Sequence, residues 1–228
     1  ARSSHHTWGN VGYYISAYNR FINIIGASTT LLNPDSWEGW YWGAMHHYGH
    51  SMRNGAAEIY GQVEDCLKEA ELIVYWASDP EVTNGVYGSF EGTTRRLWAK
   101  ELGIDMVHID PYLNETAAFL GGKWIAPKPS TSPALAQAIT YVWIKEGLYD
   151  RDYVEKRTTG FDKWKAYIMG EDQEGVARTP EWAEKETGVP AREIRALARE
   201  WGSRKTYLSA GGMGTTLGGA CRSATGAQ

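Results

Sequence analysis

The chain has 228 residues and a formal net charge of −4, from 23 Lys and Arg against 27 Asp and Glu. Its positive charges are scattered and form no basic stripe, which argues against nucleic acid as a partner. Two cysteines, Cys66 and Cys221, are too few for a disulfide framework or an iron–sulfur cluster, and the apolar run at residues 72–77 is too short to span a membrane. These properties predict a soluble, cytoplasmic protein without a nucleic-acid or membrane partner.

We expect an internal segment of a longer protein that contains parts of two domains. The chain starts at Ala1 without an initiator methionine and stops just after a glycine-rich stretch. Residues 1–58 are assigned to one domain, and residues 59–228 to a second domain that is incomplete at its C-terminal end.

The first part of the chain predicts helices and is rich in aromatic side chains. Aromatic and aliphatic residues recur at three- and four-residue spacing from Trp8 to Ile25, which predicts a buried helix ending near Gly26. A second helix is expected from Ser36 to about Asn54. Aromatic residues at this density favour a thick core or a pocket for a flat ligand.

From residue 59 onward, apolar runs of strand length alternate with helical patterns. Strands are expected at 72–76, 106–109, 123–126 and 206–209, and helices at 62–70, 85–102, 134–146, 182–188 and 191–202. The strand–helix–strand order predicts parallel neighbours with right-handed crossovers. The expected fold class is therefore α/β, a Rossmann-like parallel sheet with flanking helices, preceded by the mainly helical segment of a neighbouring domain. Residues 160–180 are expected to be a surface excursion.

Residues 33–37, Asn-Pro-Asp-Ser-Trp, are the first functional candidates, together with the histidine pair His5-His6. A serine oxygen can ligate a hard, high-valent metal, and an Asp/His pair can move protons on a substrate. The same five residues also fit a turn followed by a helix cap. Spacing alone leaves both interpretations open.

Polar loops follow three of the predicted strands, at residues 78–83, 110–116 and 211–216. Ligands of parallel sheets bind beyond the carboxyl ends of the strands, where hydroxyls, carboxylates and backbone N–H groups can hold a nucleotide. Each loop alone fits an ordinary turn. The glycines at 211–214 lack the spacing of a dinucleotide fingerprint, and there is no P-loop lysine, so neither a simple NAD domain nor an NTPase is supported.

The loops resemble those of the molybdopterin oxidoreductases of the DMSO reductase family. Residues 76–83, W-A-S-D-P-E-V-T, are similar to the family loop W-G-x-N-P-x-x-T, and residues 109–117, I-D-P-Y-L-N-E-T-A, to I-D-P-R-x-x-x-T-A. Residues 125–135 resemble the loop that ends T-D-x-A-L, and residues 211–222 the glycine-rich stretch that follows. The resemblance covers nearly the whole chain.

This resemblance implies a bis-molybdopterin guanine dinucleotide cofactor that carries molybdenum or tungsten. It implies that Ser36 is the protein ligand to the metal, and an alkoxide suits a hard, oxidised metal. It further implies that His5 and Asp35 act on a phenolic substrate. The residues implied in cofactor binding are Ser78, Asp79, Thr83, Asp110, Thr116, Thr131, Gly211, Gly212 and Arg222.

Segments 3–13, 33–40 and 219–222 most resemble family members that transfer hydroxyl groups on polyhydroxylated aromatics of the pyrogallol type. The resemblance therefore implies a transhydroxylase that works with an iron–sulfur small subunit. The alternatives are a resorcinol-type hydroxylase, another oxidoreductase of the family, and a non-catalytic α/β scaffold that lost the metal. This chain departs from the family loops at positions that include 79, 112 and 132, where Asp79 replaces Asn, Tyr112 replaces Arg and Ser132 replaces an aspartate that can hold guanine.

Overall fold

The computed structural model describes residues 14–26, 63–82 and 91–210. The chain forms two compact units, Ala1–Pro34 and Asp35–Gln228. The predicted helix over residues 36–54 and the predicted domain boundary between residues 58 and 59 lie outside the described residues, so both stay predictions.

Helix α1, Tyr14–Ile25, is the described element of the first unit. It ends at Gly26, as predicted, where φ is +89°. The prediction that this helix is buried is wrong for its C-terminal end, where Phe21, Ile24 and Ile25 are exposed. Among the described residues of this unit, no second element is present to pack against these side chains.

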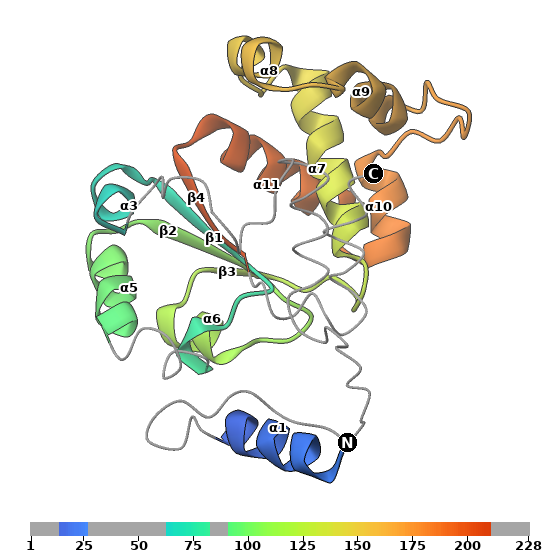
Figure 1. Ribbon diagram of the computed structural model, residues 1–228. Helices are drawn as coiled ribbons and strands as arrows, with labels where there is room; N and C mark the ends of the chain where they lie inside the picture. The colour runs from blue at the N-terminus through green and yellow to red at the C-terminus, as the bar shows by residue number, and fades with distance from the viewer. Residues whose placement is uncertain (1–13, 27–62, 83–90, 211–228) are drawn as a thin grey trace. The chain divides into compact units, whose positions relative to one another are not determined.

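The second unit is a parallel α/β sheet with helices on both faces, so the predicted fold class is confirmed (Figure 1). Its strands are β1 Leu72–Trp76, β2 Asp105–Ile109, β3 Lys123–Ile125 and β4 Thr206–Ala210. Its helices are α3 Val63–Glu69, α5 Glu91–Glu101, α6 Glu115–Leu120, α7 Ser132–Glu146, α8 Arg151–Arg157, α9 Phe161–Met169, α10 Pro180–Thr187 and α11 Ala191–Ser203.

The strand order is β3-β2-β1-β4. Val74 of β1 pairs with Val107 of β2 on one side and with Leu208 of β4 on the other. The chain runs from β1 to β3 in one direction across the sheet and returns to place β4 on the far side of β1. The topological switch point, where open α/β sheets bind ligands, therefore lies between β1 and β4.

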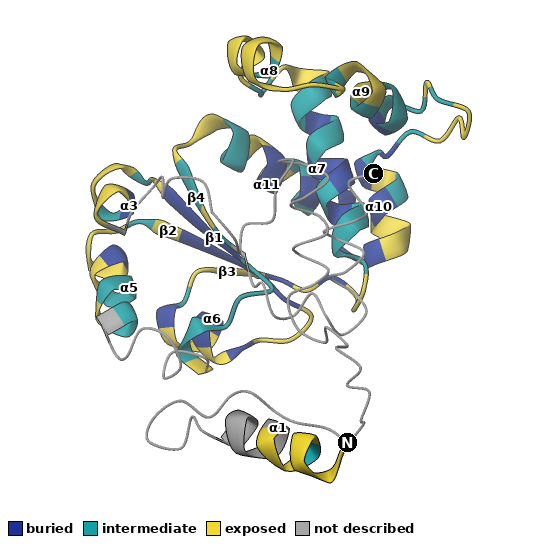
Figure 2. Ribbon diagram, viewed as in Figure 1, coloured by how far each residue is buried: buried dark blue, intermediate teal, exposed yellow. Residues whose placement is uncertain are grey.

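Both faces of the sheet are covered, which explains why β1 is a continuous apolar run (Figure 2). Leu72 and Val74 pack in a core with α7, α10 and α11, whereas Ile73 and Tyr75 pack with α3 and α5 on the other face. Cys66 is buried in this second core, as predicted. Each fully buried aliphatic side chain contributes about 1.5–3 kcal/mol to stability.

Helix α10 shows how local sequence sets the helix ends. The Thr179 hydroxyl accepts a hydrogen bond from the backbone N–H of Trp182 at 3.1 Å, and Pro180 fits the first helical position. Gly188 ends the helix in the left-handed conformation, with φ at +76°. Capped in this way, α10 packs against α7 and α11.

Residues 160–180 contain α9, and most of their side chains are exposed or half-buried, as expected for a surface excursion, although Ile168 is fully buried. Two predictions of irregular structure are wrong. A helical turn begins at Pro80 within the predicted loop after β1. Helix α6 begins at Glu115, so Thr116 lies in a helix and not in a loop. No helix in the described part of the chain is long and apolar enough to cross a membrane.

Candidate functional site

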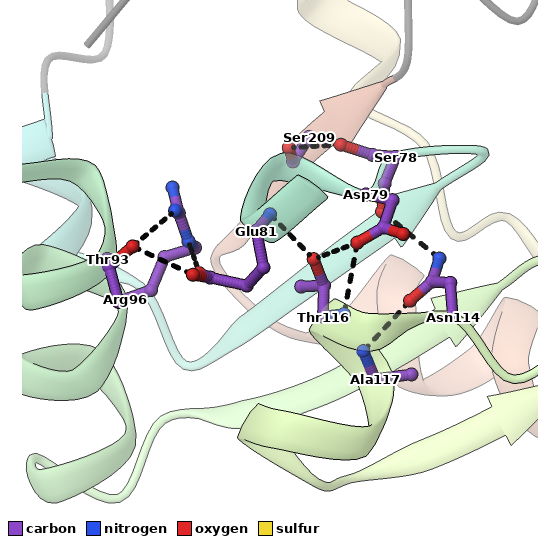
Figure 3. Close-up of polar contacts among 9 residues, drawn as sticks. All are labelled: Ser78, Asp79, Glu81, Thr93, Arg96, Asn114, Thr116, Ala117 and Ser209. Carbon is purple, nitrogen blue, oxygen red and sulfur yellow. Dashed lines mark hydrogen bonds and ion pairs between the residues drawn. The ribbon is translucent and has the colours of Figure 1, made fainter. Parts of the chain in front are cut away.

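Two serines meet at the switch point between β1 and β4. The hydroxyl oxygens of Ser78, just after β1, and Ser209, in β4, lie 3.2 Å apart (Figure 3). Ala77 precedes Ser78 with φ at +48°, in the left-handed region that favours glycine, and the family loop has glycine here. The Ala77 N–H donates to the Ile109 carbonyl at 2.9 Å, which joins this turn to β2. The switch point is therefore lined by hydroxyls on an ordered backbone.

Asp79 and Thr116 join the loop after β1 to the start of α6. The backbone N–H of Thr116 donates to Asp79 Oδ1 at 3.0 Å, and its hydroxyl donates to the same oxygen at 2.7 Å. The Thr116 hydroxyl also accepts from the backbone N–H of Glu81 at 3.1 Å. Thr116 is fully buried. The two loops that the sequence places 37 residues apart therefore form one hydrogen-bonded surface.

Asn114 joins the same two loops from below the surface, since it is only 1% exposed. Its amide N–H donates to the Ser78 carbonyl at 3.4 Å and to Asp110 Oδ2 at 3.1 Å. Its side-chain oxygen caps α6 by accepting from the backbone N–H of Ala117 at 2.9 Å. Asn114 thus uses both ends of its amide to fix the strand-end loops.

Asp110 is buried, and its carboxylate accepts the hydrogen bond from Asn114. Its Oδ1 accepts from the backbone N–H of Tyr112 at 3.3 Å. Burial raises the pKa of the Asp110 carboxyl; the hydrogen bonds from Tyr112 and Asn114 oppose this effect, and the charge of Asp79 adds to it. Asp79 and Asp110 together make this edge unfavourable for phosphate groups and favourable for ligand groups that donate hydrogen bonds.

The start of α7 forms a neighbouring part of the site. Ser132, which replaces the family aspartate, accepts a hydrogen bond from Trp76 Nε1 at 3.2 Å. The Thr131 hydroxyl donates to the Lys128 carbonyl at 2.6 Å. The Ser132 hydroxyl therefore holds the end of β1 in this structure, and the Thr131 hydroxyl holds its own loop.

The structure brings four of the predicted cofactor residues together through direct contacts or shared partners, namely Ser78, Asp79, Asp110 and Thr116. Thr131 lies at the N-terminus of α7, and the residue after it, Ser132, accepts a hydrogen bond from Trp76. The other predicted residues lie outside the described part of the chain, namely His5, Asp35, Ser36, Thr83, Gly211, Gly212 and Arg222.

Sequence reasoning did not single out Asn114, Glu81, Arg96 or Ser209 as site residues. An asparagine three residues before a helical N–H is a capping signal, so Asn114 could have been found from Asn114-Glu115-Thr116-Ala117. Glu81 and Arg96 pair across 15 residues, and no local pattern indicates such a pair.

No group of three or more His, Cys, Asp or Glu side chains that could hold a metal ion occurs among the described residues. The predicted metal ligand, Ser36, is outside them.

Comparison with known proteins decides the family. The chain is 53% identical over 226 residues to the pyrogallol hydroxytransferase large subunit of Pelobacter acidigallici, a match that covers 99% of this chain and 26% of that protein. It is 36% identical over 166 residues to the dimethyl sulfoxide/trimethylamine N-oxide reductase of Cereibacter sphaeroides, covering 69% of this chain and 20% of the relative. The chain belongs to the DMSO reductase family of molybdopterin oxidoreductases. The family implies molybdenum with a molybdopterin cofactor.

The fold agrees with this family. Acetylene hydratase from Pelobacter acetylenicus matches with a TM-score of 0.62 and 17% identity, over 83% of this chain and 23% of that one. No protein-family model matches the sequence. The chain spans 26% of the length of the first of these two curated relatives and 20% of the second.

The described residues at the carboxyl end of the sheet have the chemistry to hold a nucleoside group. A nucleoside presents ribose hydroxyls and base N–H groups, which donate to carboxylates and hydroxyls such as those of Asp79 and Ser78. The two carboxylates at this edge suit these groups better than they suit a pyrophosphate. The acceptor groups at this edge thus suit a ligand that donates hydrogen bonds.

Proposed function

We propose that this chain is part of a molybdenum enzyme that transfers hydroxyl groups on polyhydroxylated aromatic rings of the pyrogallol type. The observation that carries the proposal is the 53% identity, over 99% of the chain, to a pyrogallol hydroxytransferase large subunit. The same relative supports a small subunit as partner, which we propose contains iron–sulfur clusters, and we propose a cytoplasmic location.

Residues 59–228 are proposed to hold a molybdopterin in its guanine dinucleotide form. Ser78 and Asp79 follow β1 at the carboxyl end of the sheet, where their acceptor oxygens would bind ribose hydroxyls or the N–H groups of guanine. The buried Thr116 holds Asp79 in place through two hydrogen bonds. Asp110 orders this edge through Asn114. Gly211, Gly212, Arg222, Thr83 and Thr131 are proposed to complete the binding site.

Residues 1–58 are proposed to belong to the domain that binds the metal and the substrate. The metal, when bound, supplies oxygen-transfer and electron-transfer chemistry, and Ser36 would be its protein ligand. Asp35 would accept a proton from a phenolic hydroxyl, and His5 would exchange a hydrogen bond or a proton with the neighbouring hydroxyl.

The test uses the intact protein purified without oxygen. We expect molybdenum by elemental analysis, guanine nucleotide released on acid denaturation, and conversion of pyrogallol to phloroglucinol without net electron release. Electron release to an acceptor with resorcinol, and no reaction with pyrogallol, would instead identify a hydroxylase. Protein with neither molybdenum nor tungsten would leave only a non-catalytic scaffold.

Ser36→Ala tests the metal ligand separately. We expect the variant to keep its guanine nucleotide, since the dinucleotide contacts lie in the second domain, and to show a changed metal absorption spectrum with loss of activity. An unchanged spectrum and full activity would contradict the assignment.

A further inference from the structure

An ion pair behind the candidate cofactor edge joins α5 to the loop after β1 (Figure 3). Arg96 Nε donates to Glu81 Oε1 at 2.5 Å, and the Thr93 hydroxyl donates to Glu81 Oε2 at 2.7 Å. Both oxygens of the Glu81 carboxylate are thus held by one face of α5. Arg96 Nη2 also lies 3.4 Å from the Thr93 hydroxyl, so the three side chains form one cluster.

This pair is shielded from solvent. The Arg96 and Glu81 side chains are 17% and 13% exposed, whereas both partners in the exposed pair of Lys156 and Asp152 exceed 60%. Coulombic attraction between shielded charges is screened less than at the surface, and removing one partner leaves the other poorly solvated. The pair therefore constrains the position of Glu81.

Glu81 transmits this constraint through its backbone. Its N–H donates to the Thr116 hydroxyl at 3.1 Å, and that hydroxyl donates to Asp79 Oδ1 at 2.7 Å. A path of hydrogen bonds thus leads from Arg96 through Glu81 and the buried Thr116 to Asp79, which is proposed to face the dinucleotide. Arg96 itself lies on the far side of Glu81 from Thr116 and Asp79.

We infer that Arg96 is a positioning residue for the dinucleotide site: it fixes Glu81, and through Glu81 the relative placement of Asp79 and Thr116. This inference rests on the proposed function. A displacement of these loops would weaken several ligand hydrogen bonds at once, so the effect on cofactor binding exceeds the effect on folding.

The test compares Arg96→Met with Arg178→Met in the intact enzyme. Arg178 is a matched control because its side chain is also shielded, at 8% exposure, but it packs on Tyr167 and Trp182 in the layer formed by α9 and α10. The measurements are guanine nucleotide retained per chain after gel filtration, the dissociation rate of the nucleotide-bearing cofactor, and the melting temperature of each variant.

We expect Arg96→Met to release cofactor roughly tenfold faster than wild type, the effect of losing about one charge-assisted hydrogen bond. Arg178→Met is expected to lower the melting temperature without changing the release rate. Arg96→Lys keeps the charge but not the forked guanidinium, and we expect its rate of cofactor release to lie between those of wild type and Arg96→Met. Arg96→Lys is the test variant if Arg96→Met does not fold.

Equal release rates for wild type and both Arg96 variants would overturn the inference, as would release from Arg178→Met at the Arg96→Met rate. Either result would leave the proposed function intact. Wild-type enzyme that releases no guanine nucleotide on denaturation would overturn both.

Discussion

The two ends of the parallel sheet use polar side chains in different ways. At the amino end, Arg204 pairs with Asp105 at 2.5 Å and Lys205 pairs with Glu69 at 2.8 Å, and the side chains in both pairs are at least a third exposed. At the carboxyl end, Asn114 and Thr116 are buried and form hydrogen bonds between loops. The ion pairs at the amino end stay in contact with solvent, whereas the buried polar side chains at the carboxyl end fix the segments after β1 and β2.

This difference predicts unequal effects of mutation at the two ends. Buried polar groups that lose a partner are costly, while exposed ion pairs contribute little.

Asn114→Ala is expected to cost about 3 kcal/mol of stability, because it removes a helix cap and leaves Asp110 short of a buried partner. The matched control is Asp150→Ala, which removes the cap of α8 at an exposed position, with a bond of 2.9 Å to the Tyr153 N–H. We expect about 1 kcal/mol or less there. Unfolding in urea measures both, and equal losses would contradict a special role for the carboxyl end.

Thr116→Val keeps the side-chain shape but removes the hydroxyl that serves Glu81 and Asp79. We expect a loss of about 2 kcal/mol, because the Glu81 N–H loses its acceptor and the Asp79 carboxylate loses one of its hydrogen bonds while it keeps the one from the Thr116 N–H. Thr140→Val in α7 is the control, since its hydroxyl donates only to the Ala136 carbonyl within the same helix. A loss in Thr140→Val as large as in Thr116→Val would show that the contact between loops adds nothing.

His108 predicts a pH dependence of stability that belongs to the sheet itself. It is 1% exposed and stacks on Tyr75 at 4.9 Å between ring centroids, and its Nε2 donates to the Gly121 carbonyl at 2.9 Å. Burial lowers the pKa of His108 below its ordinary value of 6.5, so the folded state resists protonation.

The unfolded chain therefore takes up the proton first. The stabilising contribution of neutral His108 is fully present above pH 6.5 and is lost as the pH falls below it, by at most about 1.4 kcal/mol per pH unit. Urea unfolding of wild type and His108→Gln measures this at roughly pH 7.5 and roughly pH 5, above and below the ordinary pKa of histidine. Parallel pH profiles would contradict the prediction.

Arg204→Ala is expected to have the smallest effect, with no measurable change in melting temperature, because its partners Asp105 and Glu200 are solvated at the amino end. Addition of salt is likewise expected to leave the wild-type melting temperature nearly unchanged. A clear destabilisation by Arg204→Ala would remove the contrast between the two ends.

The sheet could be predicted from the sequence because β1 and β2 are apolar runs of strand length, and burial on both faces leaves a continuous pattern. The contacts between side chains at the carboxyl end of the sheet could not be predicted from the sequence. Trp76 meets Ser132 across 56 residues and Asp79 meets Thr116 across 37, and such pairs follow from strand order and helix placement rather than from local spacing. Proximity of the loops was predicted; their hydrogen bonds were not.

The loops also contain more helix than the polar residues suggested. Pro80 begins a helical turn, and Asn114 caps α6, because proline and asparagine are common at helix starts as well as in turns. The family resemblance implied a cofactor role for Ser78, Asp79, Asp110 and Thr116. In the structure, the side chains of Asp110 and Thr116 form hydrogen bonds within and between the neighbouring loops.

Hydrogen exchange of the intact protein, with and without its cofactor, shows directly whether the cofactor binds at the carboxyl end of the sheet. We expect bound cofactor to slow exchange of the backbone amides in residues 77–82 and 110–117 at the carboxyl end, and to leave residues 69–72 and 203–206 at the amino end unchanged. Equal protection at both ends, or no change at the carboxyl end, would contradict a dinucleotide site at the switch point.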